Sequence, residues 1–194
     1  MKKIFIILIL YFLNINSSYS IAPDVFVQST VNRASQILSK NISKEEKIKE
    51  LKSIASETVD IRGVGLYSLG PARKVLDNNQ LKQYFKLFEK YFLKSFSSRL
   101  AEYTNPKIEV YEKKILNENY TIVNSLLIST SERPEIKIDW RIYTKNPNNP
   151  LIRDLIIEGL SLARTQKEEF ASIINSNDGD INALFKVLED FSNR

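Results

Sequence analysis

Apolar residues in the first half of the chain recur every three or four positions, which is the spacing of amphipathic helices. This spacing predicts helices over residues 23–39, 43–58 and 78–102. Ser43 with Glu46 three positions later has the form of a capping box, and Asp77 is a favourable N-cap for the long third helix. Between the second and third helices, glycines and Pro71 interrupt a short apolar segment and predict a break there.

From residue 107 the apolar spacing falls to two, which is the period of a strand with one buried face. It predicts four strands, over residues 107–116, 120–130, 135–144 and 151–158. After them the helical spacing returns and predicts two helices, over residues 162–175 and 180–191. On the third strand four apolar residues share one side: Ile136, Ile138, Trp140 and Ile142. On the second strand the shared side carries Ile122, Leu126 and Ile128. Short turns favour antiparallel pairing, so the predicted class is α+β, an antiparallel sheet of about four strands covered on one face by helices.

The long third helix carries a row of large apolar residues, most of them aromatic. They are Leu81, Tyr84, Phe85, Phe88, Tyr91, Phe92, Phe96 and Leu100. Such a row builds either a plain core or the wall of a pocket, and the residue pattern alone leaves both interpretations open.

The amino-acid composition excludes more kinds of catalytic and metal site than the apolar spacing does. The chain contains no His and no Cys, which excludes a Ser-His-Asp triad, a Cys-His pair and the usual zinc sites. We therefore expect no catalytic residue, no metal and no cofactor. There are 28 Lys and Arg against 23 Asp and Glu, and the basic residues are spread along the chain without a cluster. This distribution does not favour nucleic acid as a partner.

The first twenty residues have the three parts of a secretory signal. A basic head, Met1 to Lys3, precedes about ten apolar residues and then small and polar ones up to Ser20. The apolar stretch is too short for a membrane-spanning helix, which needs about 20 residues. We expect residues 1–20 to be a cleaved signal peptide and residues 21–194 to form a single exported domain.

Two motifs suggest catalysis, and each is better explained structurally. Residues 159–163 lie between a strand and a helix, like a nucleophile elbow, but the last glycine is replaced by Ala163 and no His is present. Ser161 is then expected to cap the following helix, and a Ser161–Lys167 pair is the only nucleophile left open. Asp154 and Glu158 share a strand face but have no sugar-binding surroundings, so a structural role is favoured over a glycosidase pair.

The order of the motifs resembles a known family. An export signal precedes the segment from Asp60 to Gly70, then Gln80, Tyr84, Phe85 and Phe88 on a long helix, then residues 153–162 (RDLIIEGLSL) and Phe170. This arrangement resembles the MlaC family, the toluene-tolerance proteins that carry phospholipid through the periplasm of Gram-negative bacteria. Two segments depart from the family's usual residues, Pro150–Leu151 and Thr165–Lys167.

The resemblance implies an apolar cavity between the sheet and the helices that shelters the acyl chains. Expected wall residues are Val64, Tyr67, Leu69, Tyr84, Phe85, Phe88, Phe92, Ile128, Ile138, Trp140, Ile142 and Leu160. It also implies a periplasmic carrier that maintains outer-membrane lipid asymmetry. Its partners would be an inner-membrane ABC lipid transporter complex and an outer-membrane lipoprotein–porin complex. The alternative is a secreted, non-enzymatic adaptor or structural domain with a plain aromatic core.

Overall fold

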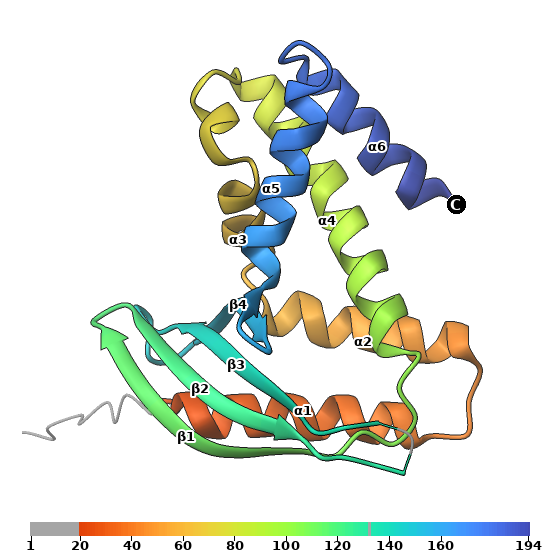
Figure 1. Cartoon of the computed structure of the whole chain (residues 1–194), viewed down its shortest axis with the longest axis vertical. Coiled ribbons are helices and arrows are strands. Elements are labelled where there is room, and N and C mark those ends of the chain that lie inside the picture. The colour runs from red at the N-terminus through yellow and green to blue at the C-terminus, as the bar shows by residue number, and fades with distance from the viewer. Residues whose placement is uncertain (1–19, 132) are drawn as a thin grey trace, which may run out of the picture.

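A computed structural model describes residues 20–131 and 133–194. The predicted signal peptide, residues 1–20, therefore lies almost wholly outside the described residues. The chain forms a five-stranded antiparallel sheet in the order β1-β2-β3-β4-β5, with helices packed against it. In Figure 1, β1–β3 lie over α1, α2 crosses above α1, and α3, α4, α5 and α6 form a group beyond α2, with α5 starting beside β4. This confirms the α+β class.

The helices are α1 (Pro23–Ser39), α2 (Lys44–Thr58), α3 (Ile61–Ser68), α4 (Asn78–Leu100), α5 (Leu162–Asn175) and α6 (Ile181–Asn193), with a 3-10 turn η1 (Gly70–Lys74). Every α-helix of the described residues except α3 begins and ends close to its predicted position, and α2, α4, α5 and α6 each begin at a side-chain cap. Ser43 makes the predicted capping box, and Asp77, predicted as an N-cap, makes a complete capping box as well. The glycine-punctuated apolar segment forms α3, whose N-terminus is capped by Asp60 through the Gly63 amide at 2.8 Å.

The strands are β1 (Ile108–Asn117), β2 (Tyr120–Leu127), β3 (Ile136–Tyr143), β4 (Leu151–Ile157) and the two-residue β5 (Leu160–Ser161). Glu158 and Gly159 join β4 to β5 with φ values of 48° and 83°. Two consecutive positive φ angles are typical of a tight hairpin turn. The fifth strand, which the sequence did not predict, is a product of this turn.

The buried face of β3 is the predicted one. On β2 the prediction was wrong, because the other set of alternating residues is buried. The buried residues of β2 are Thr121, Val123, Ser125 and Leu127. Ile122, Leu126 and Ile128 are only partly covered and belong to the other face. Pairing with β3 sets this face: Ser125 lies opposite Ile138, and its hydroxyl accepts a 2.8 Å hydrogen bond from the Trp140 indole. A buried indole N–H needs an acceptor, so the more polar side of β2 faces the core.

Candidate functional site

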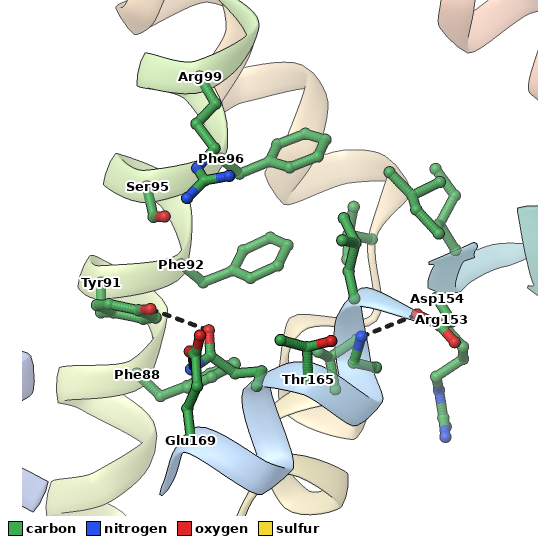
Figure 2. A pocket seen from close by; sticks show the side chains of 17 residues that line it. Phe88, Tyr91, Phe92, Ser95, Phe96, Arg99, Arg153, Asp154, Thr165 and Glu169 are labelled. Carbon is green, nitrogen blue, oxygen red and sulfur yellow. Dashed lines mark hydrogen bonds between the residues drawn. The ribbon is translucent and has the colours of Figure 1, made fainter. Parts of the chain in front are cut away.

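A cavity of about 210 Å³ opens between α4, α5 and β4. Its floor is a row of three phenylalanines on α4, Phe88, Phe92 and Phe96, each one helical turn from the next (Figure 2). Side chains four positions apart lie above one another on a helix, so the row forms one continuous apolar wall. The Phe92 and Phe96 rings are stacked with centroids 5.6 Å apart.

A second row on α4, displaced by one residue, makes the rim of this cavity. It consists of Tyr91, Ser95 and Arg99, and α5 faces it with Thr165, Gln166 and Glu169 (Figure 2). The Tyr91 hydroxyl donates a 2.9 Å hydrogen bond to Gln166, whose amide donates to Glu169 at 3.0 Å. Burial raises the pKa of the Tyr91 hydroxyl. The cavity therefore has an apolar floor and a polar, hydrogen-bonded rim.

A second cavity of about 150 Å³ lies between the sheet, α1 and α2. Its lining is almost wholly apolar and includes Ile138 and Trp140 from β3 and Val31 and Leu51 from the helices. The two cavities share four wall residues: Val59, Phe96, Ile152 and Leu155. They are adjoining compartments of one apolar space, and their shared residues separate them.

A bulge in the sheet builds this shared wall. Residues 152 and 155 of a regular strand would point to opposite faces, because side chains alternate. The register between β3 and β4 shifts after Arg141, so Ile152 pairs with Ile142 while Leu155 pairs with Trp140. Both β4 residues then reach the cavities. Val59 joins them because the end of α2 forms a parallel bridge with Ile152.

Asp154 fixes α5 to the sheet at the edge of the α4–α5 cavity. Its buried carboxylate accepts hydrogen bonds from the Ser161 hydroxyl at 2.6 Å and the Ala163 amide at 2.9 Å, and the Arg141 guanidinium lies 3.6 Å away. Ser161 in turn caps α5 by accepting from the Arg164 amide. Glu158 is exposed and accepts from the Lys137 amide instead. Both carboxylates have the predicted structural role, but they do not share a strand face, because Glu158 lies in the turn after β4.

Comparison with known proteins identifies this architecture. The profile of a family described as MlaC protein matches residues 28–190, most of the chain. The chain belongs to the MlaC family. A solved structure of a phospholipid-binding protein from Ralstonia solanacearum, in complex with a phospholipid, has the same fold with a TM-score of 0.72. It shares 18% sequence identity over 87% of this chain and 96% of that one. No protein of curated function matches the sequence.

The structure distributes the predicted MlaC wall residues over several environments. Val64, Phe88 and Phe92 line the α4–α5 cavity, and Ile138 and Trp140 line the cavity beneath the sheet. Tyr67 lines a separate, more polar hollow beside Arg141 and Arg153. The remaining predicted residues line none of these spaces: Leu69, Tyr84, Phe85, Ile128, Ile142 and Leu160.

Each of these six residues has a physical reason for lying elsewhere. Leu69, Tyr84 and Ile142 are fully enclosed in the core. Phe85 lies under the Arg62 guanidinium, 4.0 Å from its ring centroid. Ile128 follows β2 on the face that β3 pairing turns away from the core, and Leu160 is 59% exposed because the β4–β5 turn directs it outward. Their predicted contact with lipid remains a prediction.

Several residues that line the cavities in this MlaC chain were absent from the predicted wall. They are chiefly Phe96, Tyr91, Arg99, Leu155, Gln166 and Glu169. The sequence could have identified Phe96, since it continues the four-residue spacing of Phe88 and Phe92. The α5 residues could have been found from the segment Thr165–Lys167, which departs from the usual family residues and supplies two side chains to the rim.

Proposed function

We propose that this chain is a periplasmic phospholipid carrier that shuttles lipids between the outer and inner membranes. The observation that carries the proposal is the pair of adjoining cavities, with a phenylalanine row on one side and an apolar strand face on the other. Membership of the MlaC family supports it, as does the fold shared with a protein solved in complex with a phospholipid.

Energetics favour a carrier of this kind over free diffusion of the lipid. Burial of a methylene is worth about 0.8 kcal/mol, so a lipid with about thirty chain methylenes loses over 20 kcal/mol on entering water. A protein cavity offers apolar burial similar to that of a bilayer. Loading and unloading are then close to balance, and docking partners can set their direction.

The size of the cavities adds a requirement to this proposal. Their volumes of about 210 and 150 Å³ together reach only the lower end of the roughly 300–1,000 Å³ typical of small-molecule sites. A two-chain phospholipid needs more space than this. Loading therefore involves separation of α4 from α5 and β4, whose facing side chains close the larger cavity.

The role needs binding groups and no reacting ones. Asp154 and Ser161 are engaged in fixing α5, and Tyr91 and Gln166 in closing the rim. Over residues 20–131 and 133–194, no group of three or more acidic side chains could hold a metal ion. We accordingly propose a lipid-binding and transport protein and assign no enzymatic step.

Location and partners follow from the family resemblance and the predicted signal peptide. We place the mature chain in the periplasm as the soluble component of an ABC lipid transport system. Its partners would be an inner-membrane transporter complex and an outer-membrane lipoprotein–porin complex. Within the described part of the chain, no helix is both long and apolar enough to cross a bilayer.

The test is organic extraction of mature protein purified from the periplasm, followed by mass spectrometry. A carrier yields phospholipid in a stoichiometric amount, whereas an adaptor with a plain core yields none, and that result would overturn the proposal. Trp140 gives a second readout, because it is the single Trp and lines the cavity beneath the sheet. Adding phospholipid vesicles to delipidated protein should shift its fluorescence.

A further inference from the structure

Arg99 is the unusual residue of the cavity wall. Of the two cations that line the α4–α5 cavity, Arg153 forms an ion pair with Asp60 at 2.6 Å. Among the residues that the structure describes, no carboxylate lies within ion-pair distance of the Arg99 guanidinium. Figure 2 shows the Arg99 side chain beside Phe96 and Ser95 on the cavity side of α4. A charge is therefore available where the apolar floor meets solvent.

The rim has an opposite charge at its other end. Glu169 of α5 is exposed, accepts a hydrogen bond from Gln166 and lies beside Tyr91. Tyr91 precedes Arg99 by two helical turns of α4, and the Arg99 side chain runs back along the helix toward Ser95 (Figure 2), which brings the guanidinium closer to Tyr91 and Glu169 than the backbone spacing. Electrostatic effects of both Glu169 and Arg99 reach the Tyr91 hydroxyl, in opposite directions. The rim thus presents a cation and an anion with hydrogen-bonding side chains between them.

We infer that this rim is a headgroup site, in which Arg99 binds the phosphodiester of a phospholipid and Glu169 faces a headgroup ammonium. The inference rests on the proposed carrier function, because the acyl chains must lie on the phenylalanine floor for the headgroup to reach the rim. The planar guanidinium offers paired N–H donors that match phosphate oxygens. The Glu169 carboxylate repels a headgroup with additional negative charge and attracts one that ends in an amine.

The inference predicts a preference among lipids with the same acyl chains. A zwitterionic phosphoethanolamine headgroup satisfies both ends of the rim. Phosphatidylglycerol satisfies Arg99 only, and diacylglycerol satisfies neither end. Inorganic phosphate shares the chemistry of the Arg99 contact but lacks chains for the floor, so it should not compete.

The experiment loads delipidated mature protein from vesicles containing equal amounts of phosphatidylethanolamine and phosphatidylglycerol, with and without excess inorganic phosphate. Retained lipid is measured by mass spectrometry for the parent and for R99Q and E169Q. R164Q and E168Q are the matched controls, because both residues are exposed on α5 and line neither cavity. Diacylglycerol dispersed in detergent micelles forms a separate arm.

We expect R99Q to retain about fivefold less of both phospholipids, the effect of losing a charge-assisted hydrogen bond at an exposed site, and to retain diacylglycerol like the parent. We expect E169Q to retain the same total but to lose the preference for phosphatidylethanolamine. Neither control should change. Four results would overturn the headgroup site while leaving the carrier intact. They are unchanged phospholipid retention in R99Q, an unchanged lipid preference in E169Q, equal losses of lipid in R164Q or E168Q, and displacement of the lipid by inorganic phosphate alone. A parent that takes up no lipid would overturn the carrier function and, with it, this inference.

Discussion

The two halves of α4 have the same aromatic pattern and different surroundings. In the N-terminal half, Tyr84 and Phe88 are 0% and 1% exposed, and both contact the ring of Phe170. In the C-terminal half, Phe92 and Phe96 are only half-buried and lie along the cavities. The same row of aromatic residues therefore forms core in the N-terminal half of α4 and cavity wall in the C-terminal half.

Neighbouring elements cause this difference. The Tyr84 hydroxyl donates a 2.9 Å hydrogen bond to the Gly65 carbonyl, so α3 lies close against the first half of α4. Gly65 allows this approach because a side chain there would meet the Phe88 ring. No corresponding glycine of α2 or β4 is pressed against Phe92 or Phe96 among the described residues. Phe88 stands at the boundary, because it belongs to the core and also lines the larger cavity.

Removal of the Tyr84 ring should have the largest effect and would separate the two halves most clearly. We expect Tyr84→Ala to lower the free energy of unfolding by about 3–5 kcal/mol through the void it leaves in a closed core. The measurement is urea unfolding of delipidated protein. Lipid retained per folded molecule should match that of the parent. A loss of lipid with little loss of stability would mean that the first half of α4 is also cavity wall.

A methyl group at Gly65 should test the close approach of α3. The added Cβ would lie 2.7 Å from a Phe88 ring carbon, and overpacking of this kind costs about 1–3 kcal/mol. Alanine is the better helix former by up to about 1 kcal/mol, which opposes this cost. A net decrease in the free energy of unfolding of Gly65→Ala would therefore show that the clash with the Phe88 ring outweighs the gain in helix propensity. Leu66→Ala, on the exposed side of the same helix, is the control. Stabilisation by Gly65→Ala would contradict tight packing there.

Tyr84→Phe should show a smaller effect with a characteristic pH dependence. Loss of the hydrogen bond to Gly65 costs about 1 kcal/mol at neutral pH. Burial raises the pKa of the Tyr84 hydroxyl above its ordinary value of 10.0. Above that pH the unfolded chain releases a proton that the folded chain retains, so stability falls as pH rises. Tyr84→Phe removes this contribution and should flatten the alkaline decline by up to about 1.4 kcal/mol per pH unit. Unfolding curves measured on both proteins from neutral to alkaline pH check it, and parallel declines would be inconsistent with a buried hydroxyl.

Phe96→Ala should have the smallest effect on stability and the clearest effect on lipid. Because the ring is half-buried beside existing space, we expect a loss of about 1 kcal/mol or less in unfolding free energy. Phospholipid retained on purification should fall by at least half. Phe85→Ala is a matched control, since Phe85 is a half-buried aromatic of the same helix that lines neither cavity. Equal lipid content in Phe96→Ala and the parent would mean that the second half of α4 is plain core.

Local signals in the sequence account for most of the fold. Caps at Ser43 and Asp77, and the change of apolar period after residue 107, predicted the helices and strands with small errors at their ends. The helix α3 was missed because its glycines read as interruptions. The buried face of β2 was not evident either, because it depends on pairing with β3 and on the acceptor that Trp140 requires from Ser125.

The site was less predictable, since the aromatic row on α4 does not show which rings another element covers. Burial of Tyr84 depends on α3, and the cavity beside Phe92 depends on α5. The placement of Ile152 and Leu155 depends on a bulge that strand alternation cannot anticipate. The order of motifs nevertheless indicated the MlaC family, which the family comparison confirms.

Phe96 has a consequence for the timing of lipid entry, because its ring stands in the walls of both cavities. Turning the ring aside sacrifices its stacking on Phe92, about 0.5–1.5 kcal/mol. That energy is small, so we expect the half-buried ring to turn faster than the packed helices can separate. Separation of packed helices takes microseconds to milliseconds. In the proposed carrier, an acyl chain that has passed between α4 and α5 would advance under the sheet with little further delay, and the opening of the helices would limit the rate of loading.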